Sequence, residues 1–224
     1  MSVTINGNGT VTGLSTGGLV SQQVFTASGT YTKPSGIKTI KVIVTAAGGG
    51  GGSGANNYNS NSGGGAGGTA IKLIDATSIV TETVTVGTGG AGATSGNAHG
   101  AVGGVSSFGS HCSATGGHIG GSNNDPSTYT LGVGSGGDIN ITGGSGKGYQ
   151  GGDSSTDYAG GSQGGSSYWG GSGMVGSSDG TYAGQRGQAF GSGGSSGDHN
   201  GAASSGFGSG GDGKGGIIVV EEYN

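Results

Sequence analysis

The side chains with the most evident capacity for chemistry are four histidines and a single cysteine. They are His99, His111, Cys112, His118 and His199. Imidazole and thiolate groups are preferred zinc ligands, but metal sites repeat such ligands at short, characteristic spacings. These five residues follow no such spacing, so we interpret them as polar residues between structural elements. We expect no metal site and no cofactor.

Two glycine motifs resemble nucleotide-binding sequences. Residues 87–92 (GTGGAG) fit the G-x-G-x-x-G pattern and follow an expected strand, but no helix-forming run comes after them. Residues 208–214 approach a phosphate-binding loop, yet Gly215 stands where a Ser or Thr would hold magnesium. A chain with 64 glycines produces both patterns by chance. We therefore expect a protein that is not an enzyme.

The aromatic residues between the glycine clusters are better candidates for function. Tyr and Trp offer large contact areas at low entropic cost and are enriched in antibody loops and binding hot spots. The candidate binding residues are Tyr58, Tyr129, Tyr158, Tyr168, Trp169, Met174, Tyr182 and His199. A competing interpretation is that these rings cover the flanks of the protein as a small core. The sequence leaves both interpretations open.

The composition excludes several classes of protein. The chain has 224 residues, 2 prolines and no G-X-Y period, which excludes collagen. Its seven Lys and Arg form no basic stripe, so we expect no nucleic-acid partner. The apolar runs are shorter than the ~18–20 residues of a membrane span, and the N-terminus lacks the pattern of a signal peptide. We expect a protein made in a cytoplasm and not inserted in a membrane.

Strand-forming residues cluster towards the two ends of the chain. Residues 3–5 and 10–12 flank an Asn-Gly-Asn-Gly run that is typical of a hairpin turn, and residues 14–20 read as a glycine-rich link. Runs rich in β-branched residues predict a small β-sheet frame with strands near 24–46, 70–86 and 217–222. From residue 87 to 216 the strand signal nearly disappears. The predicted fold class is therefore mostly β and irregular.

Short glycine clusters fill the rest of the chain at irregular spacing. A structureless loop of this length is improbable inside a compact unit. Polyglycine II helices, with three residues per turn and a rise of ~3.1 Å, are an ordered alternative. They have no internal hydrogen bonds, so neighbouring helices must satisfy the backbone, and only small residues allow the close approach. We predict a body of packed polyglycine II helices with protruding loops.

Several runs resemble the glycine-rich domain of bacteriophage tail-fibre proteins. They are residues 29–54, 63–70, 84–96, 103–117 and 215–223. The likeness extends from about residue 20 to the end, and the glycine body is more loosely similar to the polyglycine-sandwich adhesins of long tail fibres. It implies an N-terminal attachment or oligomerisation segment at 1–20 and a receptor-binding domain at 21–224. The N-terminus lacks the fibre-attachment domain of those adhesins.

The resemblance implies a phage adhesin that is assembled in the host cytoplasm and carried on the virion. Its expected partners are a bacterial surface receptor, either an outer-membrane protein or a polysaccharide, and other tail-fibre or baseplate proteins. A homotrimer and a monomer both remain open, and we favour the trimer. One alternative is a structural tip or spacer domain without a role in recognition. Another is an ice-binding polyglycine II protein, which the irregular spacing and the aromatic residues argue against.

Overall fold

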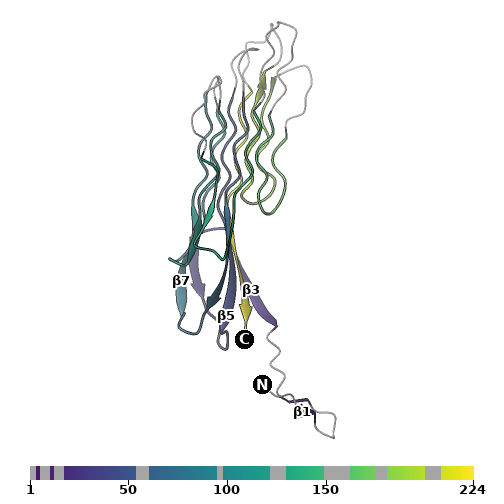
Figure 1. The fold of residues 1–224 in the computed structure, drawn as a ribbon. Helices are drawn as coiled ribbons and strands as arrows, with labels where there is room; N and C mark the ends of the chain where they lie inside the picture. The colour runs from purple at the N-terminus through teal and green to yellow at the C-terminus, as the bar shows by residue number, and fades with distance from the viewer. Residues whose placement is uncertain are drawn as a thin grey trace.

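The computed structural model is all-β in the part of the chain that it describes. That part comprises residues 4–5, 11–12, 18–53, 61–94, 98–121, 130–148, 162–174, 181–199 and 208–224. Two five-stranded antiparallel sheets occupy one end of the molecule, and extended glycine-rich segments continue from them side by side (Figure 1). The coarse prediction of a mostly β protein is confirmed.

The first sheet joins five stretches of the chain between residues 29 and 135. Its strands, in spatial order, are β10 (Gly134–Ser135), β9 (Cys112–Ala114), β8 (Ser106–Phe108), β7 (Thr81–Thr85) and β4 (Gly29–Thr32). The second sheet has the order β11 (Ile139–Ile141), β6 (Thr69–Asp75), β5 (Thr39–Thr45), β14 (Ile217–Tyr223) and β3 (Leu19–Phe25). All neighbours in both sheets pair antiparallel.

The hydrophobic core lies between the two sheets. Alternation along β5 directs Ile40, Val42 and Val44 into this core, where all three are fully buried. The first sheet contributes Tyr31 and Phe108, whose rings lie 5.4 Å apart between centroids. The odd-numbered residues of β5 therefore face outward, away from the first sheet.

One acidic side chain is buried with this core. Glu222 is fully buried, and its carboxylate accepts hydrogen bonds from the hydroxyl of Tyr31 at 2.9 Å, from Nε2 of Gln23 at 2.9 Å and from Ser21 Oγ. Burial, followed by these contacts with Glu222, raises the pKa of Tyr31. The network fixes the edge strand β3 to β14 and joins the two sheets.

Several sequence expectations about strands need correction. The near absence of strands between residues 87 and 216 is wrong, because β8, β9, β10 and β11 complete the two sheets there. These strands are two or three residues long and rich in Ser and Gly, so pairing rather than intrinsic propensity stabilises them. Strand β3 begins at Leu19, inside the expected link at 14–20 and ahead of the expected start near 24.

The predicted N-terminal hairpin is confirmed. Strand β1 (Thr4–Ile5) pairs antiparallel with β2 (Val11–Thr12), with Thr4 opposite Thr12 and Ile5 opposite Val11. A further short pair joins β12 (Thr181–Tyr182) to β13 (Asp198–His199) in the C-terminal half.

Segment 46–53 continues directly from β5 into the hydrogen-bonded, glycine-rich segments beyond the sheets, which we call the glycine body. Its N–H groups donate in turn to three antiparallel segments, 62–68, 98–104 and 211–214, so every third residue faces the same neighbour. Ala46, Gly49 and Gly52 donate to the first of these at N···O distances of 3.0, 2.9 and 3.0 Å. Its carbonyl groups accept from three further segments, 90–93, 117–120 and 194–197. The backbone of this segment is therefore hydrogen-bonded to six neighbours.

This close packing explains why glycine is required. An added Cβ would lie 1.9 Å from the carbonyl oxygen of His118 at Gly49 and 1.9 Å from that of Ser195 at Gly51. Real Cβ atoms do not approach backbone oxygens so closely, so a larger residue would push neighbouring segments apart. The rigidity of the body comes from backbone contacts rather than from an apolar core.

Candidate binding surface

A two-residue turn carries the most prominent exposed aromatic pair among the described residues. Ser167 and Gly170 exchange backbone hydrogen bonds of 3.0 and 3.2 Å, which leaves Tyr168 and Trp169 at the tip. Gly170 has φ of 125°, a conformation that favours glycine. The hydroxyl of Ser167 donates to the Phe190 carbonyl at 2.7 Å and accepts the Trp169 amide at 3.1 Å. Local backbone bonds therefore fix the turn.

The turn is fastened to the outer face of the second sheet. Trp169 donates from Nε1 to Thr45 Oγ1 at 2.9 Å, and Thr45 shares a 2.8 Å hydrogen bond with Thr69. The rings of Tyr168 and Trp169 meet edge to face with centroids 5.1 Å apart. Tyr168 is 46% exposed and Trp169 is 37% exposed. The hydrogen bond to Thr45 thus fixes the pair to the sheet, while much of the surface of both rings stays exposed to solvent.

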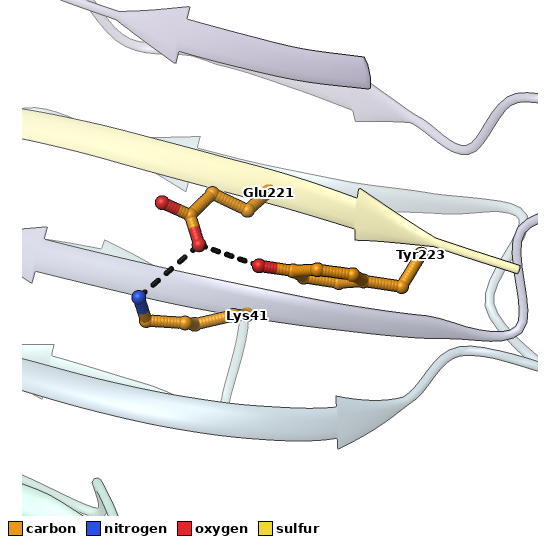
Figure 2. A network of polar contacts seen from close by, with 3 residues as sticks. All are labelled: Lys41, Glu221 and Tyr223. Atoms are coloured by element: carbon orange, nitrogen blue, oxygen red, sulfur yellow. Dashed lines mark hydrogen bonds and ion pairs between the residues drawn. The ribbon is translucent and has the colours of Figure 1, made fainter. Parts of the chain in front are cut away.

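A polar network lies on the same face of the sheet (Figure 2). Lys41, four residues before Thr45 on β5, donates from Nζ to Glu221 Oε2 at 3.1 Å. The Tyr223 hydroxyl donates to the same oxygen at 2.8 Å. The hydrogen bond from Tyr223, together with that from Lys41, lowers the pKa of Glu221, and the bond to Glu221 raises the pKa of Lys41.

Three apolar residues on this outer face of the second sheet are shielded from solvent. Ile43, Ile217 and Val219 are buried on the outer side of the sheet, and Phe190 packs against them. Thr45 pairs with Ile217 in the register of β5 and β14, so Trp169 is bound at the margin of this cluster. The aromatic turn therefore combines cover for the sheet with an exposed outer surface, and the two interpretations of these rings are compatible.

The structure brings together only some of the predicted receptor-binding residues. Tyr168 and Trp169 are adjacent, and Met174, 61% exposed, follows in the same segment. The backbones of Tyr182 and His199 lie in the paired strands β12 and β13, where Tyr182 is opposite Asp198 and His199 is opposite Thr181. Tyr58, Tyr129 and Tyr158 lie outside the described residues.

The sequence interpretation missed Lys41, Glu221 and Tyr223. All three belong to strands that were expected only as a frame. Alternation in 37–46 places Lys41 on the face opposite Ile40 and Val42, which was the available signal for an exposed position. Their proximity to Tyr168 depends on the turn docking on β5, and no local pattern encodes that contact.

Two other hollows are present among the described residues. An apolar groove of about 420 Å³ is lined by Val102, Val105, Ile119, Leu131 and Val133, among others. A smaller polar hollow of about 170 Å³ adjoins His111 and Cys112, and His111 Nε2 lies 3.3 Å from Glu82 Oε1. Burial raises the pKa of the Cys112 thiol to about 11. Within the described ranges no three His, Cys, Asp or Glu side chains cluster as metal ligands would.

In its described residues the chain forms two β-sheets and a set of hydrogen-bonded glycine segments that begins at residue 46. The sequence family described as "Glycine-rich domain" matches residues 24–223, and the chain belongs to this family. No curated protein matches the chain. Among the described residues there is no helix of the length and apolarity needed to cross a membrane.

Proposed function

We propose that this chain is a bacteriophage tail-fibre adhesin that binds a receptor on the bacterial surface. The resemblance of its glycine runs to tail-fibre domains supports the phage assignment. In this proposal the protein is carried on the virion and contacts other tail-fibre or baseplate proteins, and residues 1–20 attach or oligomerise it. We favour a homotrimer, which the mass from light scattering distinguishes from a monomer.

The glycine body supplies the rigid mount that such an adhesin needs. We propose that its segments are polyglycine II helices. The three-residue period of hydrogen bonds along segment 46–53 supports this assignment, because that helix has three residues per turn and bonds only to neighbours. Recognition residues usually sit on connections held by a rigid scaffold.

Several described segments end side by side at one end of this body. Ser53 donates to the carbonyl of Ala98, Ser62 to that of Gly121 and Ser196 to that of Ser162, each at 3.0 Å. Ser53 lies eight residues beyond Thr45, to which Trp169 is bound, so this end of the body is on the order of 25 Å from the aromatic turn. We include all eight predicted aromatic, Met and His residues in the proposed receptor-binding set.

The observation that carries the proposal is the exposure of Tyr168 and Trp169 on a turn that five hydrogen bonds hold in place. Large rings presented on a fixed backbone lose little entropy on binding and gain a large contact area. A purely structural spacer has no need to expose them in this way.

Exchanging residues 163–185 for the equivalent segment of a homologous chain tests this function. The proposal expects the exchanged protein to fold with an unchanged melting temperature and to bind a different set of bacterial strains. If the set of strains stays the same, the segment does not recognise the receptor and the structural spacer is the better description.

A further inference from the structure

The aromatic turn and the polar network lie on the same outer face of strands β5 and β14. Thr45, Ile43 and Lys41 alternate onto the same face of β5, so Thr45 and Lys41 are about 13 Å apart along the strand. Trp169 donates a hydrogen bond to Thr45, and Lys41 donates one to Glu221. Tyr168 lies beside Trp169 in the turn, with the two ring centroids 5.1 Å apart. We call this surface, made of Tyr168, Trp169, Lys41, Glu221 and Tyr223, the β5 platform.

The polar groups of the β5 platform carry both donors and acceptors. The Lys41 side chain is 39% exposed and its ammonium has three donors, while Glu221 contributes carboxylate oxygens and Tyr223 a phenol. Glu221 Oε2 accepts from both neighbours, which holds the three groups in a fixed arrangement (Figure 2). A ligand bound here meets polar groups whose positions are set before it arrives.

The charges of this platform cancel. Lys41 and Glu221 have opposite charges, and the Tyr223 phenol is neutral at physiological pH, since the ordinary pKa of a phenol is about 10 and the hydrogen bond to Glu221 raises it further. Asp75 lies one pairing row beyond, opposite Thr39, and its carboxylate accepts the amide of Thr77 at 2.9 Å. The platform therefore carries no net charge and Asp75 beside it is anionic, so an anionic ligand is disfavoured, whereas an uncharged ligand rich in hydroxyl groups can use both the donors and the acceptors.

The exposed rings favour the same class of ligand. The faces of aromatic rings carry negative quadrupole charge and attract weakly positive C–H groups. A sugar ring presents such C–H groups on its faces and hydroxyl groups at its edge. We propose that the β5 platform binds an uncharged glycan of the bacterial surface, with Tyr168 and Trp169 against sugar faces and Lys41, Glu221 and Tyr223 bonded to hydroxyl groups. This inference rests on the proposed adhesin function and selects polysaccharide over protein as the receptor at this surface.

Trp169 provides a direct readout because it is the only tryptophan in the chain. The probe is the delipidated, uncharged O-chain polysaccharide of a strain whose cells bind the full-length protein. Titration of this polysaccharide is expected to shift the Trp169 emission in a saturable way. Tyr168→Ala is expected to raise the dissociation constant at least about tenfold. The double variant Lys41→Met with Glu221→Gln, which keeps the net charge of the platform at zero, is expected to raise it by a similar factor.

Lys147→Met is the matched control. Lys147 is also exposed, and its backbone bonds Gly63 and Gln163 in the glycine body, with Gln163 on the order of 15 Å along the chain from Tyr168. The affinity of Lys147→Met for the polysaccharide is expected to stay within about twofold of that of the unmodified protein. Thermal unfolding of each variant establishes that the fold is retained, and Tyr168→Phe, which keeps the ring, is expected to retain binding if Tyr168→Ala proves unstable.

Cell binding separates failure of this inference from failure of the adhesin proposal. If the unmodified protein binds no cells, the adhesin function itself is wrong and the glycan inference falls with it. If cells are bound but the polysaccharide leaves Trp169 emission unchanged, or the platform variants bind as well as Lys147→Met, the glycan inference alone is overturned. Loss of cell binding after protease treatment of the cells, with the polysaccharide inactive, identifies a protein receptor instead.

Discussion

Trp169 and Thr45 are joined by a 2.9 Å hydrogen bond from the indole Nε1 to the hydroxyl oxygen, across 124 residues of sequence. This bond connects the exposed aromatic turn to the strand that leads into the glycine body. A large side chain surrounded by glycine and serine is thus held firmly, because its support comes from a distant sheet and not from its sequence neighbours.

Replacing Trp169 with Phe tests that link. Phe keeps an aromatic ring but cannot donate to Thr45, which retains its bond with Thr69. We expect the free energy of unfolding to fall by about 0.5–1.5 kcal/mol, the usual net value of one hydrogen bond. Urea denaturation followed by circular dichroism measures the change, and an unaltered midpoint would show that the indole bond adds no stability.

The glycine body predicts a sharp contrast between two Gly→Ala substitutions. Gly51→Ala places a Cβ 1.9 Å from the Ser195 carbonyl oxygen, so we expect a loss of at least about 3 kcal/mol, at the upper end of overpacking costs. Gly171→Ala meets nothing within 4 Å and has no positive φ, so we expect a change between zero and a gain of about 1 kcal/mol from reduced unfolded-state entropy.

Denaturation curves of the two alanine variants give both values. Equal effects at positions 51 and 171 would contradict the conclusion that backbone contacts, and not glycine content as such, determine the stability of the body.

The Lys41–Glu221–Tyr223 network predicts a dependence of stability on pH. The folded-state pKa of Glu221 is below its unfolded value of about 4.3, so its contribution is present above that pH and is lost as the pH falls through the folded pKa. Glu221→Gln is therefore expected to flatten the acid side of the stability profile. Melting temperatures of both proteins from neutral to strongly acidic pH check this, and parallel profiles would argue against the network.

Cys112 is expected to be unreactive in the folded protein. Burial raises the pKa of its thiol to about 11, and a protonated, enclosed thiol is a poor nucleophile. A thiol-reactive chromophore should release signal slowly at pH 8 from the native chain and rapidly after denaturation. Rapid labelling of the native chain would mean that β9 opens readily.

Part of this structure follows from the sequence. The β-branched runs predict β5, β6 and β14 because alternation buries Ile40, Val42 and Val44 on one side. The glycine clusters predict close backbone packing, since only glycine permits contacts such as that at Gly49. Both inferences depend on local sequence patterns and elementary sterics.

The remaining features depend on distant contacts. Strands β8 to β11 contain few strand-forming residues and exist because neighbouring strands pair with them. The side chain of Lys41 belongs to the β5 platform only because residues 167–170 dock on the same face of the sheet. A single sequence contains no local signal for either event.

Binding of the purified chain to whole bacteria is the most direct test of the adhesin proposal. The labelled protein is incubated with cells of a strain that is sensitive to the phage whose fibre carries the protein. A second sample uses cells of a resistant strain to which the same phage does not adsorb. The account predicts saturable binding to the sensitive cells alone and a dose-dependent block of phage adsorption. A well-folded chain that neither binds those cells nor competes with the phage would contradict it.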